Sequence, residues 1–171
     1  MIKNILILLS LHLALLGNSQ AASDVSFAIR NFGINVDGSF KNVDIIAEFN
    51  TNKELIDLSG KIKVSSIDTG IKSRDEHLLK KDYFDNKKYP EITLTSSTLS
   101  KVDQTNYSAM VTLTLKGISK TFTIPIKVNF KDKKITITSL FEINRKDFKV
   151  GGSSLVMGKT VKIKVTHTKN L

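Results

Sequence analysis

Apolar and polar residues alternate along most of this chain. In residues 161–165, for example, Val161, Ile163 and Val165 are separated by two lysines. A period of two places successive side chains on opposite faces of a β-strand, so each such segment predicts a strand with one dry and one wet face. The pattern recurs in residues 25–30, 43–49, 61–65, 109–115, 122–130, 135–143 and 161–165.

Turn residues separate many of these segments. Asp37-Gly38, Lys116-Gly117, Lys131-Asp132-Lys133 and Gly151-Gly152 are typical of tight connections between antiparallel strands. Strands joined in this way, each apolar on one face, predict an antiparallel sheet that closes on itself or folds into a sandwich. We expect an all-β barrel, formed as one domain by residues 22–171.

Residues 74–89 interrupt the alternation and contain few β-branched side chains. The run 77–81, two leucines between a histidine and two lysines, suits a short helix with Ser73 or Asp75 as its N-cap. Phe84 would anchor this segment. A single helix in an otherwise all-β chain is expected to close or support one end of the barrel.

The first 21 residues have the layout of a secretory signal peptide. Lys3 precedes an apolar run over residues 5–17, and the small residues Ser19 and Ala21 predict cleavage after Ala21. A retained membrane anchor is the alternative, although the run is shorter than the roughly 20 apolar residues that a spanning helix needs. The mature protein is therefore expected in the periplasm or outside the cell.

The chain carries a formal net charge of +10, spread over nearly every segment. Proteins that bind nucleic acids usually gather their cations in one patch, often with arginine, so no nucleic-acid partner is expected. A dispersed lysine coat favours solubility and attraction to an anionic membrane surface.

Arginine is rare in the chain, with only Arg30, Arg74 and Arg145 beside 23 lysines. The planar guanidinium suits bidentate pairing. We therefore expect Arg74 or Arg145 to pair with Asp68, Asp75 or Asp147 and so to hold the helical segment on the barrel. Contact with an anionic headgroup is the alternative role.

Candidate catalytic residues are few. His77 lies beside Asp75 and Glu76, but no cysteine and no serine in a strained glycine-flanked turn offers a nucleophile. His77 and His167, without cysteines, are too few for a typical zinc site. His77 is expected to be structural, and neither an enzyme nor a metal or other cofactor is predicted.

Several motifs, in order along the whole mature chain, resemble the YceI-like family. They are Asp24-Val-Ser-Phe-Ala-Ile-Arg-Asn-Phe-Gly33, Val36-Asp-Gly-Ser-Phe40, Ser66-Ile-Asp-Thr69, Arg74-Asp-Glu-His-Leu78, Asp82-Tyr-Phe-Asp85, Lys88-Tyr-Pro-Glu-Ile-Thr93, Leu113-Thr-Leu-Lys-Gly-Ile-Ser-Lys120 and Ile143-Asn-Arg-Lys-Asp-Phe148. The resemblance implies an eight-stranded, lipocalin-like antiparallel barrel with a short helix near one end. It also implies a lumen that holds a polyisoprenoid, an isoprenoid quinone or a fatty-acid-like lipid, export to the bacterial periplasm, frequent homodimers and a link to stress responses.

The residues alone leave an open lumen and a filled core equally possible, because eight-stranded barrels occur in both forms. The resemblance favours the open lumen. An envelope protein that binds no ligand and uses its lysine-rich exterior, or an enzyme that acts on lipid at His77, are the alternatives. The predicted lining comprises Phe27, Ile29, Phe49, Ile62, Val64, Leu94, Val111, Leu113, Phe141 and Ile143, with Phe32, Phe40, Leu78, Phe84 and Phe148 as rim or plug.

Overall fold

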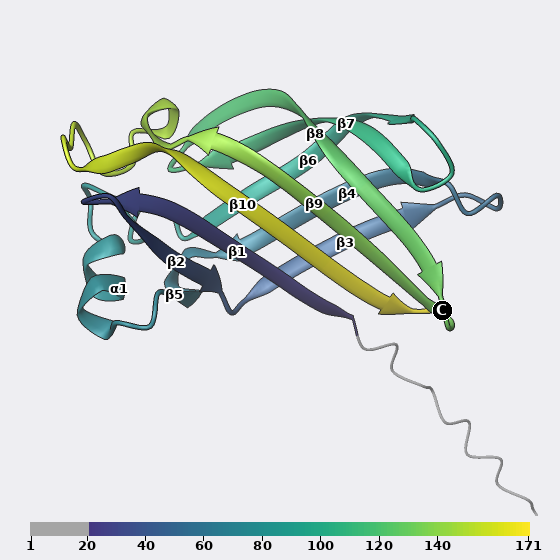
Figure 1. The fold of residues 1–171 in the computed structure, drawn as a ribbon, viewed down its shortest axis with the longest axis horizontal. Helices are drawn as coiled ribbons and strands as arrows, with labels where there is room; N and C mark the ends of the chain where they lie inside the picture. Colours follow the sequence, from purple (N-terminus) through teal and green to yellow (C-terminus); the bar gives the residue numbers. More distant parts are fainter. Residues whose placement is uncertain (1–20) are drawn as a thin grey trace, which may run out of the picture.

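A computed structural model describes residues 21–171 and shows a single antiparallel sheet of ten strands, curled into a barrel (Figure 1). The strands follow the order β3-β4-β6-β7-β8-β9-β10-β1-β2-β5 across the sheet. They are β1 (Ala22–Asn31), β2 (Ile34–Phe40), β3 (Val43–Phe49), β4 (Leu55–Lys63), β5 (Ile67–Asp68), β6 (Glu91–Lys101), β7 (Asn106–Leu115), β8 (Ile118–Lys131), β9 (Lys134–Asn144) and β10 (Met157–Asn170). The expected all-β barrel is confirmed.

The count of ten strands differs from the predicted eight because two strands are bent. Only two residues separate β2 from β3, and the 3-10 turn η1 (Val64–Ser66) separates β4 from the two-residue β5. If each bent pair is counted as one strand, ten becomes eight. Pairing of β5 with β2 brings the two halves of the sheet together, since Phe40 lies opposite Ile67.

Two of the four predicted tight turns connect paired strands, at Lys116-Gly117 and Lys131-Asp132-Lys133, whereas Gly151-Gly152 lies in the long connection between β9 and β10, and the fourth turn is wrong. Asp37-Gly38 lies within β2, and the chain reverses instead at Phe32-Gly33, between β1 and β2. Gly38 is in the strand because it faces a ring: a Cβ there would lie 2.4 Å from Cζ of Phe27. Gly38, which predicts a turn in the sequence, therefore marks a position where the Phe27 ring packs closely on the backbone.

The predicted helix is present as α1 (Lys72–Leu78), at one end of the barrel, while the C-terminus lies at the other end (Figure 1). Its cap differs from the prediction, because Ile71 is the N-cap residue and no side chain caps the helix. Asp75 instead accepts hydrogen bonds from the backbone N–H and the hydroxyl of Thr69. This carboxylate therefore ties the helix to the end of β5.

Buried residues form two clusters along the barrel. One centres on Tyr107, Ala109 and Val128, and the other, nearer α1, centres on Val64, Ile67 and Phe148. No helix among residues 21–171 is long and apolar enough to cross a bilayer. The predicted signal peptide lies almost wholly outside the described residues.

Candidate ligand-binding cavity

A row of residues in register defines the interior wall. Ile45 of β3 pairs with Gly60 of β4, Gly60 pairs with Leu94 of β6, and Leu94 pairs with Leu113 of β7. Because these partners share one face of the sheet, the missing side chain of Gly60 leaves space between larger neighbours. A Cβ at Gly60 would meet nothing closer than 3.8 Å.

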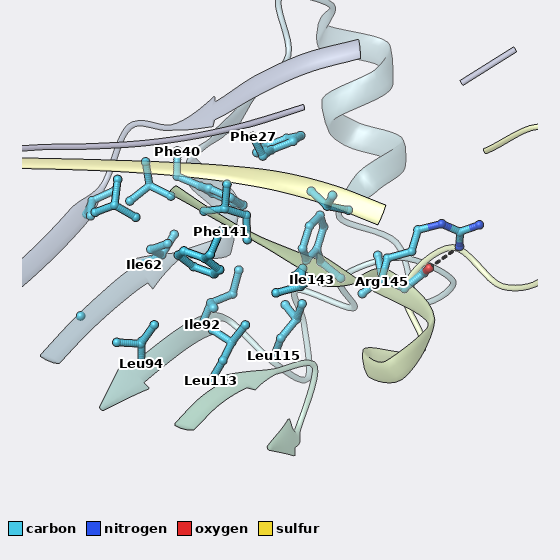
Figure 2. Close-up of a pocket in the computed structure, with 18 of the residues that line it drawn as sticks. Phe27, Phe40, Ile62, Ile92, Leu94, Leu113, Leu115, Phe141, Ile143 and Arg145 are labelled. Atoms are coloured by element: carbon cyan, nitrogen blue, oxygen red, sulfur yellow. Dashed lines mark hydrogen bonds between the residues drawn. The ribbon is translucent and has the colours of Figure 1, made fainter. Parts of the chain in front are cut away.

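The interior contains a cavity of about 380 Å³ with an overwhelmingly apolar lining. This volume lies within the range of about 300–1,000 Å³ that is typical of small-molecule sites. Figure 2 shows Phe27, Ile62, Leu94, Phe141 and their neighbours converging on this space from different strands.

Aromatic rings shape both ends of the interior. Near α1, Phe40 packs against Phe27 at 5.7 Å and against Phe84 at 6.1 Å between ring centroids. Towards the other end, Phe49 and Phe130 meet edge to face at 5.6 Å and belong to the packed core. Neither ring of this second pair lines the cavity.

Ten of the fifteen residues predicted to line the lumen lie on the cavity wall. Eight of them lie in strands, where alternation along the sequence makes the face of a side chain predictable, while Leu78 lies in α1 and Phe84 in the loop after it. They are Phe27, Ile29, Phe40, Ile62, Leu78, Phe84, Leu94, Leu113, Phe141 and Ile143.

The other five residues lie elsewhere. Phe49 packs on Phe130, while Val111 is fully buried in the same cluster and does not line the cavity. Val64 belongs to η1, where the strand alternation has ended, and Phe148 is buried in the cluster near α1. Phe32 is not a plug, because it is 73% exposed in the β1–β2 turn.

Arg145 is only 2% exposed, yet it forms no ion pair. Its guanidinium donates instead to four backbone carbonyls: Val150 at 2.7 Å, Gly152 at 3.0 Å, Met157 at 3.1 Å and Gly158 at 2.8 Å. Figure 2 shows this side chain at the edge of the apolar space, with one of these bonds dashed. Burial lowers the pKa of Arg145.

The predicted arginine–aspartate pair is therefore wrong for the described residues, where the three ion pairs all use lysine. Arg74 donates to the Thr69 hydroxyl at 2.7 Å and to the Thr69 carbonyl. Asp147 is exposed in η2 (Arg145–Phe148). A buried guanidinium has five N–H groups to satisfy, and loop carbonyls within reach supply that need without a carboxylate.

His77 lines the cavity and packs edge to face on Tyr83, with 4.9 Å between ring centroids. Among residues 21–171 no hydrogen bond joins it to a carboxylate. Since Asp75 bonds to Thr69, the local acid–base set suggested by the sequence is not assembled. Described histidine, aspartate and glutamate side chains form no cluster of three or more that could hold a metal ion.

Polar wall residues also occur away from α1. His167 is 3% exposed, lines the cavity and lies 2.9 Å from the Ser23 hydroxyl through Nδ1. Burial, with repulsion from Lys169, lowers the pKa of His167, although Asp44 acts in the opposite direction. Ser139, also on the wall, donates to the Pro125 carbonyl at 2.6 Å. These hydroxyls are satisfied within the protein.

Several wall residues were not predicted. Val161, Ile163 and Leu115 belong to alternating strands, so the same pattern could have identified them. Gly60 and Tyr83 carried no such signal, since one has no side chain and the other lies in the loop after α1.

A family model described as a YceI-like domain matches residues 18–168. The chain belongs to the YceI-like family. A UPF0312 protein of Photorhabdus laumondii is 35% identical over 100 residues, covering 56% of this chain and 50% of that protein. The YceI protein of Escherichia coli is 32% identical over 106 residues, which cover 61% of this chain and 55% of the relative. The chain thus aligns with about half the length of each.

Solved structures show the same fold as this YceI-like chain. Burkholderia cenocepacia BcnA is 28% identical, with a TM-score of 0.80, over 85% of this chain and 95% of that one. A polyisoprenoid-binding domain from Saccharophagus degradans has a TM-score of 0.68 over 86% of this chain and 93% of that domain. At 15% identity, this second likeness concerns the fold alone.

Proposed function

We propose that this YceI-like protein binds and carries, or sequesters, a long-chain apolar amphiphile in its lumen. The supporting observation is the apolar cavity of about 380 Å³, opened in part by Gly60. Each buried methylene contributes about 0.8 kcal/mol, so ten contribute roughly 8 kcal/mol before ordering costs, which corresponds to about micromolar affinity. Such binding selects length and shape more than atom identity.

The ligand class is inferred from the cavity wall, which is apolar over most of its area and polar at the α1 end. Most of the lining is hydrocarbon, which suits a polyisoprenoid, an isoprenoid quinone or a fatty-acid-like chain. Arg74, His77 and Thr69 form a polar region at the α1 end. This arrangement favours an amphiphile whose tail lies in the lumen and whose polar end faces α1. The S. degradans domain, described as polyisoprenoid-binding, is consistent with this class.

Gentle purification followed by native mass spectrometry and lipid extraction tests the proposal. The wild-type protein should retain a long-chain compound, or take up a polyprenyl phosphate, an isoprenoid quinone or palmitate when each is offered. Gly60→Leu should fill the lumen and reduce binding at least about tenfold, since it occupies the volume of several methylenes. A wild-type protein that stays empty with all three probes would contradict the proposal and favour a ligand-free envelope role.

Thr95→Leu is the matched control, because Thr95 is exposed on the strand next to Gly60 and its replacement places the same leucine side chain outside the barrel. It should bind the probes as the wild type does. His77→Ala separates carriage from catalysis, because a carrier would lose at most affinity or stability, whereas an enzyme would lose turnover of the bound lipid.

We also propose export to the bacterial periplasm, on the basis of the leader pattern of residues 1–21. N-terminal sequencing of protein from the native host should begin at Ala22. A chain that begins at Met1 would contradict cleavage.

A further inference from the structure

Four large apolar side chains gather at one tip of the barrel. Phe32 is 73% exposed and Ile34 is 70% exposed in the β1–β2 hairpin, while Leu155 is fully exposed and Val156 is 43% exposed in the loop before β10. The backbone N–H of Phe32 donates to the Val156 carbonyl at 3.0 Å, so hairpin and loop lie side by side. We refer to Phe32, Ile34, Leu155 and Val156 as the apolar tip.

The tip is held in a defined conformation. The Ser154 hydroxyl accepts from the N–H of Val156 at 3.3 Å and from that of Met157 at 3.1 Å. Nearer the barrel, the Arg145 guanidinium binds the carbonyls of Gly152 and Met157, on both sides of Leu155. The exposed side chains therefore project from a braced loop.

Neither the residue preference of the turn nor packing in the core explains why a phenylalanine occupies position 32. Its φ is +50°, in the left-handed region where two-residue hairpins favour Asn, Asp or Gly, and Gly33 follows at +77°. A bulky residue is unfavourable in that region, and exposure of its ring adds a second cost. A ring kept there against both costs points to an external apolar partner.

We propose that the apolar tip inserts into the surface of an anionic lipid bilayer. Charge supports this partner, since residues 148–160, around the loop before β10, hold Lys149 and Lys159 and no acidic residue, and residues 25–36 hold Arg30 and no acidic residue. Exposed apolar side chains enter the interface while cations attract anionic headgroups. Four side chains are few for a second copy, because stable interfaces bury about 800 Å² per partner.

The position of the tip gives this docking a purpose that rests on the proposed lipid-binding function. Asn31 directly precedes Phe32 of the tip, Met157 directly follows Val156, and both Asn31 and Met157 line the cavity. Figure 1 shows the end of β1 and the loop before β10 at the same end of the barrel as α1. Docking would place this end of the cavity against the membrane, so that a lipid could pass between them with little exposure to water.

A tryptophan reporter tests the docking, because the chain has no tryptophan of its own. The Leu155→Trp protein should show a blue-shifted emission, quenched by bilayer-embedded quenchers, with vesicles of phosphatidylethanolamine and phosphatidylglycerol. Phosphatidylcholine vesicles should give a much weaker response. The matched control is Val102→Trp, since Val102 is 68% exposed in the β6–β7 turn, and this reporter should not respond.

Loss of the tip should abolish vesicle binding. Phe32→Ser with Leu155→Ser should lower the vesicle partition coefficient at least about tenfold, because two large side chains no longer enter the interface, while Val102→Ser leaves it unchanged. Unchanged binding of the double variant, or no binding by the wild type, would overturn the proposal. So would a blue shift without vesicles that grows with protein concentration, since a second copy would then cover the tip.

The docking and the lumen can be tested separately. Gly60→Leu should lose the lumenal lipid and still bind vesicles, whereas the double tip variant should keep a lumenal lipid and lose vesicle binding. If the protein binds vesicles but never holds a lipid in its lumen, the carrier function is contradicted and the docking is not.

Discussion

At the scale of single residues, two glycines shape the interior in opposite ways. Gly38 lies under the ring of Phe27, with its would-be Cβ 2.4 Å from the ring, so its small size lets that ring lie against the wall. Gly60 lines the cavity, and a Cβ there would meet only ordinary contacts at 3.8 Å and 3.9 Å, so its small size adds to the free volume. The same residue type thus packs one site closely and keeps another hollow.

Gly38→Ala should therefore destabilise the protein by about 1–3 kcal/mol, the usual cost of forcing an extra carbon into a packed site. Gly60→Ala is the matched control, because Gly60 also lies in a strand, and it should change stability by no more than about 0.5 kcal/mol. Urea unfolding followed by circular dichroism measures both. Equal effects would show that Phe27 can move freely.

A second residue-scale prediction concerns pH. His167 has a pKa below its ordinary value of 6.5, so the unfolded chain binds its proton more readily than the folded protein does. The stability that this histidine contributes is present above pH 6.5 and is lost as the pH falls from there towards the lowered pKa. His167→Gln should flatten the dependence of unfolding free energy on pH in that window, and an unchanged slope would contradict the assignment.

At the scale of elements, Arg145 links η2 to the loop that follows it and to the start of β10. It sits in η2, and its four carbonyl partners lie in the following loop and at the start of β10. Gly151 extends the connection, because its N–H donates to the Asp82 carbonyl at 2.9 Å, in the loop after α1. This network fixes the α1 end of the barrel.

Arg145→Lys should lower stability by about 2–4 kcal/mol, since one ammonium cannot reach all four carbonyls and charged hydrogen bonds contribute about 1.5–3 kcal/mol each. Differential scanning calorimetry should show a melting temperature several degrees lower. Arg74→Lys is the control, because Arg74 bonds to Thr69 alone and should cost about 1 kcal/mol or less. Equal melting temperatures for both variants would refute the bracing role.

At the scale of the whole molecule, the cavity borders both packed clusters of the barrel. The cluster around Tyr107 and Val128 packs the interior away from α1, with the Tyr107 hydroxyl accepting from the Leu55 N–H at 3.3 Å. Ile124, Ile126 and Ile137 of this cluster line the cavity, as do Phe40 and Leu113 of the cluster near α1. The packed residues of both clusters therefore surround the cavity.

A bound lipid should therefore stabilise the whole fold. A ligand at 100 times its dissociation constant adds about 2.7 kcal/mol, which raises the melting temperature by roughly 5–10 °C for a chain of this size. Delipidated protein should show this rise when palmitate or an isoprenoid quinone is added, and Gly60→Leu should not. A rise of equal size in that variant would place the ligand outside the lumen.

Periodicity along the chain specifies the fold class and much of the cavity wall. A period of two fixes which face of a strand is apolar, so residues such as Phe27, Ile62 and Leu113 could be assigned to the interior before any coordinates. The assignment failed at Val64, because the strand alternation ends there. It also failed at Phe49, because this side chain packs on the Phe130 ring and does not line the cavity.

The contents of the interior depend instead on contacts between residues that are distant in the sequence. Whether Gly60 leaves a void depends on Ile45 and Leu94, which lie far from it in sequence or across the sheet, and Arg145 found carbonyls where the local sequence offered Asp147. The reason is physical: local patterns set the direction of a side chain, whereas free volume and hydrogen-bond partners depend on which strands the closed barrel brings together.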